Sequence, residues 1–120
     1  METGTRYKIE HIVQTNETAD ILGSGGLGVY ATPAMICLME KTAYECALNQ
    51  GLPTVGTRLE ISHLKACLPG KALTAECELI EVEGRRLSFN VKVVSGDEII
   101  GEGRHDRFVI DPERFMSKLK

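Results

Sequence analysis

The sequence predicts an α+β domain in which a five-stranded antiparallel sheet wraps one long central helix. Three observations lead to this fold class. A helix lies between clear start and stop signals, the apolar period changes from about 3.6 to about 2 after it, and tight turns separate the alternating segments that follow. Because the element order is one strand, one helix and four strands, a single curved sheet is the element that can bury the helix.

Size and composition describe one globular domain over residues 1–120. Hydrophobic residues make up 42% and charged residues 26%, which suffices for a core without metals or disulfides. The net charge of −3 argues against a nucleic-acid partner, which would favour a basic surface. No apolar run reaches transmembrane length and the N-terminal METGTRYKIEH contains no signal-peptide stretch, so we expect a cytoplasmic protein with no membrane partner.

The four cysteines of the chain are Cys37, Cys46, Cys67 and Cys77. No pair has CxxC spacing, and no cluster of His and Cys has the spacing of a zinc finger. We therefore expect small buried apolar side chains in a reducing compartment rather than disulfides or metal ligands. A catalytic thiol is the less favoured alternative.

The region before the helix combines one short strand with a loop. Apolar alternation predicts a strand over Tyr7–Val13, and the polar stretch Gln14–Asp20 follows it. The next segment, ILGSGGLGVY, contains four glycines, which would weaken the interior of a helix or strand, so it predicts a flexible loop. A phosphate-binding loop is disfavoured, because no GK[ST] follows and no βαβ pattern surrounds it.

The helix is predicted over about Pro33 to Gln50. Thr32 is a good N-cap, Pro33 suits the first turn, and Gly51 followed by Pro53 predicts the end. The middle of the helix, AMICLME, is apolar nearly all round, which is typical of a helix buried over most of its surface.

Four strands are predicted after the helix, at Gly56–Leu68, Leu73–Leu79, Leu87–Val93 and Ile99–Ile110. Turns are predicted between them at Pro69-Gly70, Glu83-Gly84 and Ser95-Gly96-Asp97. Gly101 and Gly103 predict bends or bulges in the last strand. Tight turns between long alternating strands indicate an antiparallel meander.

Three polar residues stand out as candidates for chemistry. Glu40 interrupts an apolar helix stretch, so its carboxylate is either reactive or solvated and paired. His63 shares a strand face with apolar neighbours, which fits either an acid–base group or a core histidine. Thr32 is either a plain N-cap or a hydroxyl beside the backbone N–H groups of the helix start, which suit an oxyanion.

Two further histidines have weaker cases. His11 lies in the strand before the helix, where a structural role is favoured. His105 lies next to Asp106 and Arg107, and these three could form a surface ion-pair set as readily as a site.

Four pieces between about Val29 and Phe115 carry a resemblance to known proteins, namely ATPAMICLMEKTA, VGTRLEISHLKACLPG, VEGRRLSF and GEGRHDRFVI. Over this range the chain resembles the hot dog-fold acyl-CoA thioesterases, and within them the fluoroacetyl-CoA thioesterase type. The resemblance implies a hot dog fold and hydrolysis of a small acyl-CoA to the free acid and CoA. It implies no metal and no organic cofactor. It also implies at least a homodimer, because such active sites form at the subunit junction and a five-stranded sheet leaves an edge open.

The resemblance assigns the catalytic roles to Thr32, Glu40 and His63. Glu40 is expected to attack the thioester as a nucleophile, giving a mixed anhydride, or to activate water as a general base. His63 is expected to activate water or to protonate the departing CoA thiolate. Gly56 is expected against the thioester and the pantetheine arm of the substrate, and Arg107 is expected to face the substrate side.

The resemblance leaves the acyl group and two rival functions open. The fluoroacetyl-type enzymes have bulky aromatic residues ahead of the helix as a lid, whereas Gly23 and Gly26 stand here, which implies an open entrance that admits a different acyl group. Four arginines could bind CoA, namely Arg85, Arg86, Arg104 and Arg107. They could equally lie on a solvated strand edge or turn. The rivals are a hot dog hydratase or dehydratase acting on acyl-CoA or acyl-carrier protein, and a non-catalytic acyl-CoA binding module.

Overall fold

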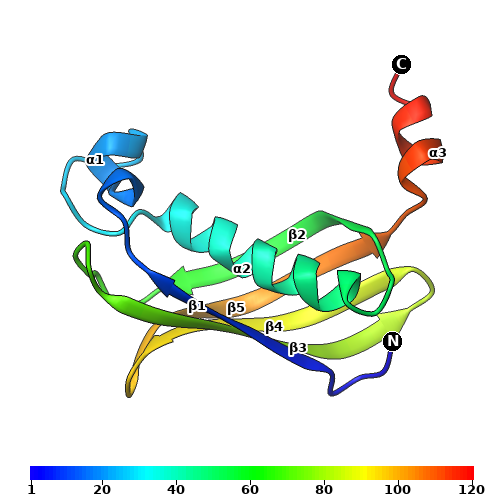
Figure 1. Ribbon diagram of the computed structural model, residues 1–120, viewed down its shortest axis with the longest axis horizontal. Coiled ribbons are helices and arrows are strands. Elements are labelled where there is room, and N and C mark those ends of the chain that lie inside the picture. The colour runs from blue at the N-terminus through cyan, green and yellow to red at the C-terminus, as the bar shows by residue number, and fades with distance from the viewer.

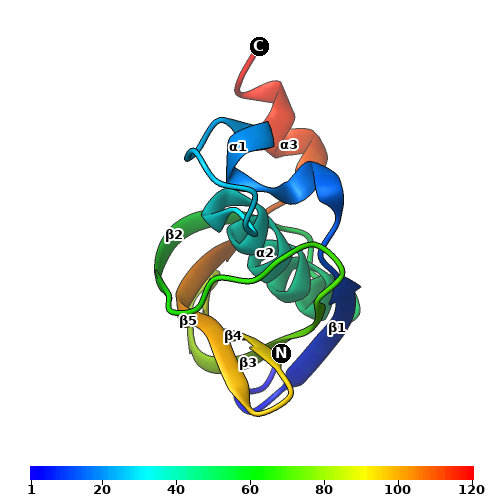
Figure 2. The ribbon, with the colours of Figure 1, turned by 90° about the vertical axis from the view of Figure 1, so that its left-hand side faces the viewer.

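A computed structural model describes residues 1–120, in which one long helix crosses a five-stranded antiparallel sheet (Figure 1). The strands are β1 (Arg6–Ile12), β2 (Thr54–His63), β3 (Ala72–Glu83), β4 (Arg86–Ser95) and β5 (Glu98–Val109). The helices are α1 (Ala19–Leu22), α2 (Thr32–Leu48), α3 (Pro112–Ser117) and the 3-10 turn η1 (Thr15–Glu17). The predicted fold class is confirmed, and the sheet curves around α2 in the end-on view (Figure 2).

The sheet has the strand order β1-β3-β4-β5-β2. Strands β3, β4 and β5 form a meander, β1 pairs with β3 at one edge, and β2 pairs with β5 at the other. The prediction that all four strands after the helix form one meander is wrong for β2, because residues 64–71 separate it from β3 and it lies at the far edge of the sheet. The second edge of β2 has no partner strand within the chain. In the β2–β5 register Gly56 lies opposite Arg107 and Leu59 lies opposite His105, with a bulge between Gly56 and Arg58.

The start of α2 differs from the prediction in one respect. The N-cap is Ala31, whose extended backbone precedes the first helical residue, and no side chain caps the helix. The prediction of Thr32 as N-cap is wrong, because its hydroxyl is bonded to the imidazole of His63. The helix ends at Leu48, two residues before the predicted end at Gln50.

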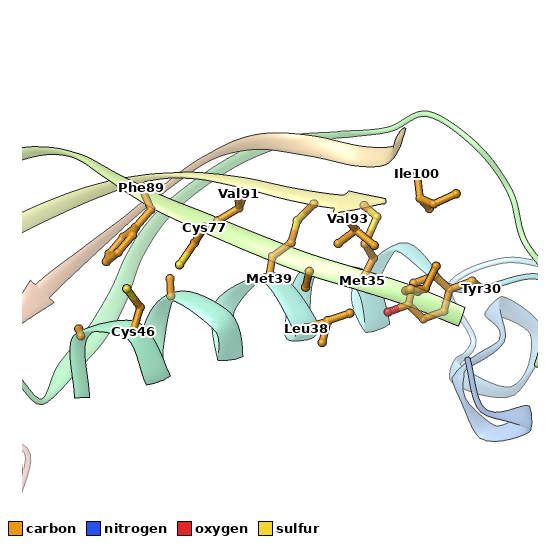
Figure 3. Close-up of a cluster of buried hydrophobic side chains, with 14 of the residues drawn as sticks. Tyr30, Met35, Leu38, Met39, Cys46, Cys77, Phe89, Val91, Val93 and Ile100 are labelled. Carbon is orange, nitrogen blue, oxygen red and sulfur yellow. The ribbon is translucent and has the colours of Figure 1, made fainter. Parts of the chain in front are cut away.

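Only one side of α2 is buried. The buried face consists of Met35, Leu38, Met39, Thr42, Ala43, Cys46 and Ala47. It packs against Phe89, Val91 and Val93 of β4, which Figure 3 shows beside the helix. The opposite face exposes Cys37, Lys41, Tyr44 and Leu48. The expectation of a helix buried over most of its surface is therefore wrong for the single chain, and so is the expectation that Cys37 is buried; the other three cysteines are buried.

Smaller differences concern the segments around the sheet. The polar stretch before the glycines contains η1 and the start of α1, neither of which was predicted, and α1 continues through Ile21 and Leu22 of the segment predicted as a loop. The bulge in β5 falls at Ile100, beside Gly101, whereas Gly103 stays in register. Helix α3 was not predicted either, although the Asp111 side chain accepts from the Arg114 N–H at its start. No helix of the chain has both the length and the apolar character needed to cross a bilayer.

Candidate active site

Two clusters of polar side chains lie along α2, each where the helix meets β2. The first cluster joins the start of the helix to the end of β2, where Thr32 Oγ1 lies 2.7 Å from His63 Nδ1. The ring of Tyr30 lies edge-on to the imidazole, with 6.4 Å between ring centroids. The other imidazole nitrogen, His63 Nε2, is buried and has no hydrogen-bond partner in the chain. A buried N–H or lone pair without a partner is costly, so this nitrogen is a candidate for contact with a ligand or a second chain.

The second cluster surrounds Glu40, eight residues further along the helix and about 12 Å away along its axis. The Oε2 atom of Glu40 lies 3.5 Å from Arg107 Nη1 and 3.9 Å from His105 Nε2. The Glu40 side chain is 45% exposed, so the carboxylate has one side on protein and one side on solvent. The structure thus brings Thr32 and His63 together, and Glu40 together with Arg107, but it separates these two pairs within one chain.

Arg107 is a buried cation beneath the Glu40 carboxylate. Its Nε donates to Thr54 Oγ1 at 2.7 Å and its Nη2 donates to the Thr54 carbonyl at 3.2 Å. The Tyr44 ring lies over the guanidinium, 5.6 Å from Cζ to the ring centroid. Burial lowers the pKa of Arg107 from its ordinary value, and the Glu40 carboxylate opposes that effect. The guanidinium stays charged, because an arginine is not deprotonated in a protein.

Gly56 of β2 lies directly against the Glu40 carboxylate. A Cβ placed on Gly56 would come 2.6 Å from Glu40 Oε2 and 3.2 Å from Arg107 Nη1. Real side chains do not make the shorter of these contacts, so only glycine lets β2 approach the carboxylate this closely.

His105 is buried at the Glu40 cluster, with 1% of its surface exposed. Of the two alternatives left open for His105, Asp106 and Arg107, the surface ion-pair set is therefore wrong, because His105 and Arg107 are buried. The strand alternation puts His105 and Arg107 on the helix side, while Asp106 lies near Arg86, 3.8 Å away. Desolvation lowers the pKa of His105 below its usual range.

An apolar pocket of about 640 Å³ adjoins the first cluster. Thr32 and His63 form part of its wall, together with the side chains of Ile36 and Leu64. The segment ahead of the helix contributes Ser24 and Val29 to the same pocket. The Thr32 hydroxyl and the His63 imidazole thus border a space that suits an aliphatic group, with the segment ahead of the helix at its side.

The other candidate residues, apart from Arg107, lie outside the two polar clusters. His11 Nε2 lies 2.8 Å from Glu17 Oε1 and ties β1 to η1, as expected of a structural histidine. Of the four basic residues considered for CoA, only Arg107 lies in either cluster. Arg86 is paired with Glu81 and Glu83, and Arg85 lies over the Phe108 ring. No three His, Cys, Asp or Glu side chains gather closely enough to hold a metal ion.

Three residues of the Glu40 cluster escaped the sequence analysis in their observed role, namely Thr54, Tyr44 and His105. The period-2 alternation of β5 could have placed His105 on the same face as Arg107. Nothing in the local sequence indicates that Thr54, 53 residues before Arg107, accepts from the guanidinium. That contact depends on the pairing of β2 with β5.

Comparisons with known proteins show the family to which the chain belongs. Residues 13–113 match the family described as fluoroacetyl-CoA-specific thioesterase. Over 95 residues the chain is 39% identical to a fluoroacetyl-CoA thioesterase of Streptantibioticus cattleyicolor, an alignment that covers 77% of this chain and 68% of that relative.

Solved structures give the same result. A structure of the fluoroacetyl-CoA thioesterase FlK superposes with a TM-score of 0.89 at 33% identity, covering 99% of this chain and 95% of that one. A point mutant of FlK in complex with fluoroacetate and CoA superposes with a TM-score of 0.88 at 33% identity, covering 96% and 99% of the two chains. A hot-dog-like protein from Thermanaerovibrio acidaminovorans shares the fold alone, with a TM-score of 0.87 at 21% identity over 99% and 90%. These likenesses confirm the predicted hot dog fold.

Proposed function

The chain belongs to the fluoroacetyl-CoA-specific thioesterase family and is an acyl-CoA thioesterase, and we propose that Thr32, Glu40 and His63 are its catalytic residues. The observation that supports this assignment most is the pairing of Thr32 with His63, whose free Nε2 is buried without a partner. A thioester or a second carboxylate that reaches this nitrogen would satisfy it. Gly56 and Arg107 belong to the substrate-facing part of the same site, beside Glu40.

We propose that the site is completed in a homodimer. The free edge of β2 can pair antiparallel with the same strand of a second copy. An antiparallel pairing of this kind places the start of β2 in one chain, at Gly56, near the end of β2 in the other chain, at His63. Glu40, which sits above Gly56, would then meet the Thr32–His63 pair of the second copy. The exposed Tyr44 and Leu48 on α2 are apolar surface that such a pairing can cover.

In the nucleophilic route, Glu40 attacks the thioester carbonyl and displaces CoA, which leaves an acyl–glutamyl anhydride. As the imidazolium, with its Nδ1–H donated to the Thr32 hydroxyl oxygen, His63 can transfer its Nε2 proton to the departing thiolate and become a neutral imidazole, which takes a proton back from the water that attacks in the next step. Water then hydrolyses the anhydride, giving the free acid and restoring Glu40. In the alternative route Glu40 removes a proton from water, which attacks the thioester directly. A pre-steady-state burst of CoA equal to the enzyme concentration would favour the anhydride.

The first turn of α2 can stabilise the oxyanion in either route. Backbone N–H groups at a helix start have no carbonyl four residues earlier to bind, and the helix dipole is positive there. The first turn begins at Thr32, which borders the apolar pocket. A thioester with its acyl chain in the pocket would place its carbonyl oxygen near these donors.

The apolar pocket supports a small aliphatic acyl group as substrate. Its wall next to the catalytic pair contains Ile36, Leu64 and Val29, and the segment ahead of the helix adds Ser24 and Tyr30. We further propose that residues 1–120 act as one hot dog unit in the cytoplasm. No nucleic-acid or membrane partner is proposed.

The proposal is tested by measuring thiol release from a panel of short acyl-CoAs. Glu40→Ala should abolish most of the activity, while Glu45→Ala, on the same helix and bonded to Tyr7, serves as the matched control. Equal rates for wild type and Glu40→Ala would eliminate Glu40 as a catalytic residue. Hydration of crotonyl-CoA without thiol release would favour the hydratase alternative, and tight CoA binding without any turnover would favour a binding module.

A further inference from the structure

The imidazole of His105 lies between β2 and the Arg107 guanidinium, and it touches both. Its Nδ1 lies 2.8 Å from the Arg58 carbonyl oxygen, and its Nε2 lies 3.0 Å from Arg107 Nη1. Both neighbours have fixed roles in a hydrogen bond, since a carbonyl only accepts and a guanidinium only donates. The His105 Nδ1 therefore has the proton and Nε2 accepts from Arg107, so the ring is neutral and a single tautomer is defined.

The neutral ring leaves the Glu40 carboxylate with one cationic neighbour. Since Nε2 is occupied as an acceptor, its 3.9 Å approach to Glu40 is not an ion pair. Protonation of Nε2 would remove the acceptor for Arg107 and place a second cation against the first, at a buried position. Desolvation, which lowers the pKa of His105, acts in the same direction.

Arg107 is held on three sides. Thr54 accepts from Nε and Nη2, His105 accepts from Nη1, and the remaining approach of Nη1 is toward Glu40. Without the His105 acceptor, Nη1 could rotate away from the line that joins it to the carboxylate. The planar guanidinium transmits its own orientation to the group it pairs with, because its N–H directions are fixed.

We propose that His105 is a positioning residue, which orients the Arg107 guanidinium and through it the Glu40 carboxylate. The inference rests on the proposed function of Glu40. The groups that face the imidazole are Glu40 from α2, Arg107 from β5 and the Arg58 carbonyl from β2, with Tyr44 above the guanidinium.

Two substitutions separate the two hydrogen bonds of the ring. His105→Gln can place an amide oxygen near the Nε2 position and keep the acceptor for Arg107. His105→Asn can place an amide N–H near the Nδ1 position and keep only the bond to Arg58. The variants are matched in polarity, so a general loss of packing affects both.

Measured with acyl-CoA hydrolysis, kcat of His105→Asn should fall about 10- to 100-fold with KM nearly unchanged, the loss expected when a reacting group is misplaced on the order of 1 Å. His105→Gln should stay within a few-fold of wild type. In an Arg107→Met background the Asn and Gln variants should become equivalent, because His105 acts through Arg107.

The outcomes distinguish this inference from the proposed function. If wild type hydrolyses acyl-CoA and Glu40→Ala does not, equal kcat for the Asn and Gln variants would overturn the positioning role alone. If wild type releases no CoA from any thioester, the proposed function fails, and the role of His105 fails with it. The ¹⁵N resonances of the His105 ring test the inference without an activity assay. They should show a neutral ring with the proton on Nδ1 at pH 7, and a proton on Nε2 or an imidazolium would contradict the inference.

Discussion

The two polar clusters along α2, at Glu40 and at Thr32, differ in how completely their polar atoms are paired within the chain. The Glu40 carboxylate lies next to the Arg107 guanidinium and against Gly56, and the buried His105 accepts from that guanidinium. All of these groups belong to the same chain. At Thr32 the hydroxyl and the imidazole bind each other, and the outer nitrogen of the imidazole has no partner. The first region is preorganised within the chain, and the second is incomplete.

This difference explains how one helix can serve a site that neither of its ends forms alone. The positions of Glu40 and Thr32 are fixed about 12 Å apart by the helix rise, so no side-chain rotation brings them onto one carbonyl. A second copy, placed antiparallel along β2, would supply the missing half to each region. In the proposed site, the charged region around Glu40 is separate from the apolar region, where the acyl group is proposed to bind.

The largest loss of kcat is expected when the imidazole of His63, whose Nε2 has no hydrogen-bond partner in the chain, is removed. His63→Ala should lower kcat by about 10²- to 10⁴-fold, the range for loss of a general acid or base. His11→Ala, at a structural histidine, is the control, and its kcat should change little. A His63→Ala variant with wild-type kcat would mean that the Thr32 end takes no part in the reaction. The assay is steady-state thiol release.

A smaller loss of kcat is expected when a side chain is added at Gly56, next to the Glu40 carboxylate. Gly56→Ala should lower kcat about 10- to 100-fold, because the new Cβ pushes the Glu40 carboxylate from its place. Gly26→Ala, where a Cβ meets nothing within 4 Å, should retain wild-type kinetics. Thermal unfolding of both variants shows whether the fold is intact. Unchanged kcat in a folded Gly56→Ala protein would contradict the position assigned to Glu40.

The hydroxyl of Thr32 gives a third test. Thr32→Val removes the bond to His63 Nδ1 while keeping the side-chain shape, and kcat should fall about tenfold or more, since the imidazole loses the group that orients it. Thr32→Ser keeps the hydroxyl and should stay within a few-fold of wild type. Equal kcat values for the valine and serine variants would show that the hydroxyl bond is not used.

The smallest expected effect is on stability. His105 has a folded pKa below its ordinary value of about 6.5, so the unfolded chain binds more protons as the pH falls through that range. The free energy of unfolding should therefore fall on acidification below pH 6.5, by at most about 1.4 kcal/mol per pH unit from this group. The fall should be weaker in His105→Gln, which does not titrate there. Denaturant unfolding at several pH values measures the difference, and parallel curves would refute it.

The elements could be predicted from the sequence because their signals are local. Pro33 and Gly51 bracket α2, and each hairpin turn contains a glycine. The polar clusters could not be predicted in the same way. Arg107 meets Glu40 across 67 residues, and only the pairing of β2 with β5 brings them together.

The incorrect predictions have the same origin. Thr32 has the local properties of an N-cap, but His63, 31 residues later, competes for its hydroxyl. The charged neighbours of His105 leave a surface ion-pair set open, although strand alternation sends Asp106 to the other face. The apolar character of the middle of α2 indicates a buried helix, and within one chain the face with Cys37, Tyr44 and Leu48 stays exposed.

The central claim is that each active site combines Glu40 of one chain with Thr32 and His63 of another. It is tested by co-expressing Glu40→Gln and His63→Ala chains with different affinity tags and isolating the mixed dimer. A shared site predicts that this dimer, built from two inactive chains, has one intact site and about half the wild-type thioesterase activity. An inactive mixed dimer, or the absence of any dimer, would contradict the claim.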